Sequence, residues 1–185
     1  MTTPVPSVPD FLAGFGPQQS DWQSLWVNAA AFFQQRVIFR ATQSGTATTL
    51  PSSGSITTIT YDNILEDPYS GWSASTHRWT APAGYSGWYQ VTVTVWVTAP
   101  SSAQVVLEPY VQTTAAASNI AQGYPLTAVV TGTSAAAAEG TFYPYLTGGL
   151  DAVYGAAAIK NASASVSTDL TAGTQSSLEI CWVSS

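Results

Sequence analysis

The fold of this chain is decided by the stretch YQVTVTVWV at residues 89–97. Apolar and polar residues alternate along it, apart from the final tryptophan of the polar row. Successive side chains of a β-strand point to opposite faces, so this alternation predicts a strand with one buried row and one outer row. The buried row comprises Tyr89, Val91, Val93, Val95 and Val97, and the outer row comprises Gln90, Thr92, Thr94 and Trp96.

Further short strands are predicted on both sides of this stretch, at residues 37–41, 56–62, 105–111, 126–130, 141–145, 156–159, 163–166 and 178–183. A long polar loop is expected over 63–76. The alanine runs at 115–117, 135–138 and 156–158 are expected in loops or at close-packed strand edges. Many short strands separated by turns are typical of a β-sandwich or barrel rather than an α/β fold. The sequence therefore predicts one all-β domain over residues 37–185.

Two different segments are predicted before this domain. Residues 1–19 are rich in Pro and Gly, which indicates an extended arm. Residues 20–36 are predicted to form an amphipathic helix, capped by Ser20 with Gln23 at the capping-box spacing. Its aromatic stripe must pack on the domain, on sister helices or on another protein. The residues expected to anchor the chain in an assembly are Phe11, Trp22, Leu25, Trp26 and Phe33.

Charged residues are scarce in this chain. They make up 8% of its 185 residues, against about 25% in ordinary soluble domains. The net charge is −6, and the only cations are Arg36, Arg40, Arg78 and Lys160, so binding to nucleic acid is excluded. A surface this poor in charge indicates either that much of it is covered in an assembly or that a Ser/Thr-rich extracellular domain tolerates low charge.

No catalytic site is predicted. His77 is the single histidine, and no Gly-x-Ser-x-Gly sequence accompanies the serines. The clustered carboxylates of Asp62, Glu66 and Asp67 could bind calcium, although solvated turn carboxylates are the favoured interpretation. Cys181 is expected to be a buried, inert thiol. No cofactor and no bound metal are therefore expected.

No targeting or membrane segment is predicted either. Residues 1–10 lack the basic and apolar regions of a secretory signal. No apolar run reaches the length of about 18 residues that a membrane-spanning helix requires.

A family resemblance is carried by residues 69–97, YSGWSASTHRWTAPAGYSGWYQVTVTVWV. They contain an aromatic residue at Trp72, the segment STHRWTAP, and GWYQV, a Gly-x-aromatic-x-apolar sequence that opens the strand. Asp62 precedes them in TYDNILEDP, and LTAGTQSSLEICWV near the C-terminus supplies a closing strand. In these features the chain resembles the tumour-necrosis-factor and complement globular-head superfamily, especially its phage members.

The resemblance spans roughly residues 36–185, with specific motifs at 56–97 and 168–183. Tyr85 and Ser86 lengthen the turn before Gly87 relative to the family pattern. The arm and helix, PDFLAGFGPQQSDWQSLW, resemble the leaders of minor tail and related virion proteins of actinobacterial phages.

The resemblance implies a jelly-roll sandwich, usually trimeric, without a catalytic role. Trp88 and Trp96 lie on the outer row of the central strand, and a three-fold axis would cover them as subunit-interface residues. The alternative is that the N-terminal helix covers them within one subunit.

The expected function is that of a non-enzymatic phage virion protein. We expect a homotrimeric minor tail, tail-tip or fibre-knob protein that contacts the host surface and binds other virion proteins through its arm. One alternative is a capsid decoration protein, such as a head fibre, with the same trimer. Another is a lectin-like module for a host cell-surface glycan, with possible stacking residues Tyr69, Trp72, Tyr143 and Tyr145. Location in the virion, on the tail or the capsid surface, is expected in either phage role.

Overall fold

The structure, a computed structural model of the chain, describes residues 37–98, 104–114, 123–126, 128–131, 135–160, 162, 164–171 and 175–184. These residues belong to one compact unit, 37–185. The predicted arm and helix, with all five anchoring residues, lie outside the described residues and stay predictions. No helix in the described part of the chain is long and apolar enough to cross a membrane.

The described residues form an all-β structure, as predicted. Their strands are β1 (Val37–Thr42), β2 (Thr49–Leu50), β3 (Thr57–Thr58), β4 (Asn63–Glu66), β5 (Trp72–Ser73), β6 (Arg78–Thr80), β7 (Gly87–Thr98), β8 (Gln104–Thr113), β9 (Gly123–Leu126), β10 (Ala128–Thr131), β11 (Ala135–Phe142), β12 (Tyr145–Leu146), β13 (Ala152–Lys160), β14 (Val166–Ser167) and β15 (Ser177–Ser184).

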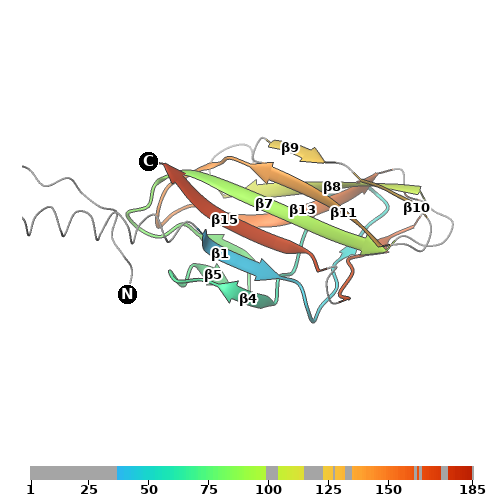
Figure 1. The fold of residues 1–185 in the computed structure, drawn as a ribbon, viewed down its shortest axis with the longest axis horizontal. Coiled ribbons are helices and arrows are strands. Elements are labelled where there is room, and N and C mark those ends of the chain that lie inside the picture. The colour runs from blue at the N-terminus through green and yellow to red at the C-terminus, as the bar shows by residue number, and fades with distance from the viewer. Residues whose placement is uncertain are drawn as a thin grey trace, which may run out of the picture. The chain divides into compact units, whose positions relative to one another are not determined.

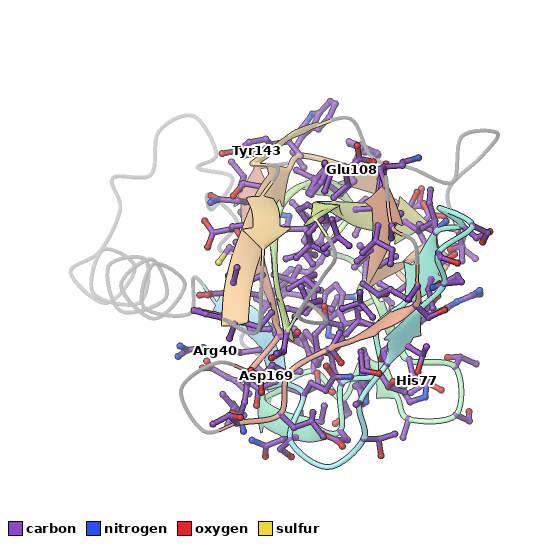
Figure 2. The ribbon with its side chains drawn as sticks, turned by 90° about the vertical axis from the view of Figure 1, so that its right-hand side faces the viewer. Arg40, His77, Glu108, Tyr143 and Asp169 are labelled. Carbon is purple, nitrogen blue, oxygen red and sulfur yellow. The ribbon has the colours of Figure 1, made fainter. Side chains whose placement is uncertain are left out.

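Two antiparallel sheets make a sandwich (Figure 1). The front sheet has the order β4-β1-β15-β7-β11-β9, with β12 also pairing with β7. The rear sheet has the order β10-β8-β13-β6-β5, with β3 also pairing with β13. A separate ribbon joins β14 and β2. Figure 2 looks at the sandwich from the side and shows side chains filling the space between the layers.

Strand β7 is the centre of the front sheet, and its predicted alternation is confirmed. The side chains of Tyr89, Val91, Val93, Val95 and Val97 are completely buried, whereas the residues between them are partly or largely exposed. The neighbouring β15 repeats this pattern, with Leu178 and Ile180 buried opposite Val93 and Val91. These rows form the front half of the core.

Strand β13 is the centre of the rear sheet and contains the alanine run at 156–158, which corrects the expectation of a loop or a strand edge there. The run at 115–117 lies outside the described residues. Residues 152–159 are buried on both faces, and 156–158 lie between β8 and β3 rather than at an edge. Residues 135–138 also lie in a strand, β11, at the register of β7. Small side chains allow the neighbouring groups to approach a strand closely, which composition alone did not reveal.

The prediction of a loop over 63–76 is wrong, because the segment contains two short strands. It contains β4, which pairs with β1, and β5, which pairs with β6. All four residues of β4 are exposed, so no alternation marked them as a strand. The strand predicted at 56–62 is reduced to β3, and the one predicted at 126–130 is two strands, β9 and β10, in different sheets.

Both ends of the described domain lie at one end of the sandwich. Val37, the first residue of β1, pairs with Cys181 near the end of β15. Ser184, at the end of β15, pairs with Trp88 at the start of β7. The other end of the sandwich carries the end of β7 and the start of β11, where Thr98 pairs with Ala135.

Candidate functional site

The outward side of three strands of the front sheet, β7, β11 and β15, carries little charge. We define the front face as the outward residues of β7, β11 and β15: Trp88, Gln90, Thr92, Thr94, Trp96, Ala135, Ala137, Glu139, Thr141, Ser177, Glu179 and Cys181. Only Glu139 and Glu179 among them carry a charge.

Hydroxyl groups at the centre of the front face are hydrogen-bonded within the sheet. Thr92 and Thr141 are joined at 3.2 Å, and Thr94 donates to Glu139 at 3.1 Å. These two contacts satisfy part of the hydrogen-bonding capacity of the threonine hydroxyls within the sheet.

The two tryptophans predicted at the subunit interface lie on this face, but at its opposite ends. Trp88 and Trp96 are eight residues apart on β7, which corresponds to about 26 Å at a rise of about 3.3 Å per residue. Trp88 is 48% exposed. Trp96 is less exposed and lies opposite Ala137. The structure therefore brings each of them to the front face without bringing them together.

Trp88 and Tyr145 form an exposed aromatic cluster, and Tyr143 is exposed two residues before Tyr145. The β12–β7 pairing sets Tyr145 opposite Trp88, and their rings meet edge to face at a centroid distance of 5.6 Å. Tyr143, labelled in Figure 2, and Tyr145 are 52% and 48% exposed. The buried Pro144 between them accepts a hydrogen bond from the Tyr89 amide at 2.9 Å. The cluster is therefore fixed on the strand that carries the core row.

The other two predicted stacking residues lie elsewhere and pack against the core. The Trp72 ring stacks on Phe39 at a centroid distance of 5.1 Å. The Tyr69 ring meets Tyr85 at 5.1 Å, and burial together with the hydrogen bond to Tyr85 raises the pKa of Tyr69. The four predicted residues thus separate into a partly buried pair, Tyr69 and Trp72, and an exposed pair, Tyr143 and Tyr145.

The carboxylates of Asp62 and Asp67 hold two different loops rather than standing free in solvent. Asp62 accepts hydrogen bonds from the backbone amides of Ser44, Gly45 and Thr46 at 2.6–2.8 Å. Partial burial opposes ionisation of Asp62, but these hydrogen bonds outweigh it and lower the pKa of the group.

Asp67 accepts from the amides of Gly71 and Trp72 and from the indole of Trp79. No group of three His, Cys, Asp or Glu residues that could hold a metal ion occurs in the described ranges.

His77 precedes β6 in the rear sheet, whereas Cys181 lies on β15 in the front sheet. His77 has a left-handed backbone, with φ at 53°, and its ring packs near Trp72 at 6.2 Å. Cys181 is only half-buried on the front face, which corrects the expectation of a buried thiol. Its pKa is raised by burial first and then by the charges of Glu179 and Glu66.

A row of outward residues across the rear sheet was missed in the sequence. Backbone pairing sets Ser73 opposite Arg78 and Gln112 opposite Tyr154. The Arg78 guanidinium lies over the Tyr154 ring, 4.6 Å from its centroid. The alternation of RWT, with Trp79 buried, was the available signal for an outward Arg78.

Comparison with solved structures identifies the fold, whereas the sequence comparisons find no match. No protein-family model matches the chain, and no curated protein sequence matches it. The structure is similar to murine APRIL at pH 5.0, with a TM-score of 0.52 and 9% identity over 80% of this chain and 99% of that chain. It is also similar to Eiger TNF from S. frugiperda, with a TM-score of 0.52 and 9% identity over 82% of this chain and 96% of that chain. The domain therefore has the jelly-roll fold of the tumour-necrosis-factor domains.

Proposed function

We propose that this chain is a non-enzymatic structural protein of a bacteriophage virion and that it assembles into a homotrimer through the front face. In this proposal it is a minor tail, tail-tip or fibre-knob protein that contacts the host surface. The observation that carries the proposal is the front face itself, which spans the full length of β7 with two charged side chains among its outward residues. The phage assignment is supported by the sequence resemblance of the leader and of residues 69–97.

The chemistry of the front face suits a buried contact between subunits. The cores of protein interfaces are depleted in charged residues and enriched in aromatic ones. On the front face, threonine hydroxyls are already paired inside the sheet, so covering them costs little. Trp88 and Trp96 supply the aromatic groups that most often dominate binding energy.

The trimer is tested by the solution mass of the full chain, measured by light scattering behind a sizing column. The expected value is three times 19.4 kDa, about 58 kDa. A monomer at all attainable concentrations contradicts the trimer.

The interface is tested by the variant Thr92→Arg. Glu179 lies opposite Thr92 on β15, so the new arginine lies beside a carboxylate of its own subunit. The subunit is therefore expected to remain folded. A cation inside a subunit contact costs several kcal/mol when it is desolvated, so we expect the mass to fall toward 19.4 kDa. The matched control is Thr58→Arg on the rear sheet, for which the trimer mass is expected.

A capsid decoration protein is the second candidate, because both ends of the described domain lie at one end of the sandwich and would attach it equally well to a capsid. Antibody labelling of purified virions separates the two. Label on the tail tip supports the first proposal, label on the capsid supports the second, and unlabelled virions contradict both.

A further inference from the structure

The outward row on the rear sheet holds an arginine that no acidic group neutralises. The described cations are Arg40, Arg78 and Lys160. Lys160 pairs with Glu108 at 3.9 Å, and Arg40 lies opposite Glu179 and Glu66 in the strand register. Arg78 has no ion-pair partner among the described residues. Among the described cations, Arg78 is therefore the one with neither an ion pair nor an acidic residue opposite it in the strand register.

The guanidinium of Arg78 is held in place by the sheet. Tyr154, on β13, is largely buried and forms the surface on which the guanidinium lies at 4.6 Å. Stacking on an aromatic ring leaves the N–H edge of an arginine free, and this planar edge matches a carboxylate or phosphate with two parallel hydrogen bonds. Because the ring fixes the plane in advance, binding an anion here loses less side-chain entropy.

Neutral hydrogen-bonding groups continue the row on both sides. Ser73 on β5 is the backbone partner of Arg78, and Gln112 on β8 is the partner of Tyr154. The row therefore crosses four strands in the order Ser73, Arg78, Tyr154, Gln112, which places a hydroxyl and an amide on either side of one cation. The neighbours Trp79 and Val153 point into the core, so the row lies on the outward side of the rear sheet, away from the front sheet.

The composition of the row selects the ligand. One cation between a hydroxyl and an amide fits a molecule with one negative group and many hydroxyl groups. Nucleic acid needs several phosphate contacts and therefore several cations, which the row lacks. An uncharged glycan accepts hydrogen bonds from an arginine but leaves its charge unpaired.

We infer that the row Ser73–Arg78–Tyr154–Gln112 binds an acidic saccharide, with Arg78 receiving its carboxylate or phosphate group. The inference rests on the proposed function in that it supplies the ligand for a host-contacting protein. The binding itself takes place within one subunit and does not need the trimer.

The test measures binding of three probes to the full chain by calorimetry at low salt. A hyaluronan hexasaccharide supplies carboxylates, mannose 6-phosphate supplies a phosphate, and chitohexaose is the neutral control. We expect at least one acidic probe to bind and chitohexaose to bind at least about tenfold more weakly. The acidic probe that binds more tightly identifies the anionic group.

Two variants on the same sheet separate the site from general charge effects. Arg78→Gln is expected to weaken binding at least about tenfold, and Arg78→Lys to weaken it also, because the planar fork is lost. Lys160→Gln removes the same charge from the paired cation and is expected to leave affinity within about twofold, since that charge is already neutralised. Circular dichroism and unfolding curves confirm that each variant is folded.

Three results would overturn the inference: neither acidic probe binds, Arg78→Gln binds as well as the unaltered chain, or Lys160→Gln loses as much affinity as Arg78→Gln. The variant Thr92→Arg separates the test of saccharide binding from the test of the trimer. If it is monomeric and still binds the acidic probe, both proposals stand. If the unaltered chain is a monomer that binds the probe, only the trimer fails.

Discussion

Gly155 and Tyr61 fit together so closely that a β-carbon at position 155 would overlap the tyrosine hydroxyl. Tyr61 is completely buried, and its ring meets Trp72 edge to face at 6.3 Å. Its hydroxyl has no hydrogen-bond partner among the described residues, and burial raises its pKa. Because Gly155 has no side chain, the Tyr61 ring can pack directly against β13.

Gly155→Ala is therefore expected to lower the free energy of unfolding by about 1–3 kcal/mol, because an overpacked core must shift. Tyr61→Phe is expected to change it little or to raise it, since the removed hydroxyl is buried and unpaired. Urea unfolding followed by fluorescence measures both. The double variant should recover part of the loss, and an unaltered midpoint for Gly155→Ala alone would contradict the close fit.

Asp62→Asn is expected to destabilise the domain by about 1 kcal/mol at neutral pH, a modest value because the site is exposed. The pKa of Asp62 is lowered from 3.8 by its hydrogen bonds to the 44–46 loop. Because the pKa is lowered by folding, the ionised Asp62 contributes its full stabilisation above pH 3.8. This contribution to the free energy of unfolding is lost as the pH falls through the pKa of the folded state. The difference between the two proteins should therefore shrink below pH 3.8 in urea unfolding series, and a difference that grows on acidification would sink this account.

The thiol of Cys181 is expected to react slowly with iodoacetamide at pH 8, because burial and two neighbouring carboxylates raise its pKa and only the thiolate is nucleophilic. Unfolding the chain in urea should accelerate alkylation. If the front face is covered by sister subunits, the monomeric Thr92→Arg variant should react faster than the trimer. Equal rates in folded and unfolded chain would contradict the protection.

Trp88 and Tyr145 are expected to stabilise each other through their edge-to-face contact. A double-mutant cycle of Trp88→Ala and Tyr145→Ala should give a coupling of about 0.5–1.5 kcal/mol. The unfolding measurements must be made at one protein concentration, because association raises apparent stability. Additive losses would mean that the two rings do not pack on each other in solution.

The central strand could be predicted from sequence because its pattern is local. Alternation over 89–97 specifies both the buried row and the outward side of Trp96, and the same logic identified β15. Strand β4 gave no such signal, since its pairing with β1 is a backbone interaction and all its side chains face solvent. The pattern of apolar and polar side chains indicates which residues are buried, and it cannot predict an edge strand whose side chains are all exposed.

The candidate sites depended on pairing between distant strands, which the sequence alone does not reveal. Trp88 meets Tyr145 only because β12 pairs with β7. Arg78 reaches Tyr154 only because β6 and β13 are in register at Trp79 and Val153. The carboxylates of Asp62 and Asp67 read as turn residues, and their amide partners became visible only with the loop backbone in place.

The side-by-side ends of β1 and β15 make this domain suited to engineering as an insert. Val37 lies opposite Cys181, and Ser184 lies opposite Trp88. A domain whose chain enters and leaves at one place can be spliced into a surface loop of another protein without stretching either. A peptide fused after Ser184 would emerge beside the entry point of β1, and the opposite end of the sandwich would stay open for display of a grafted loop.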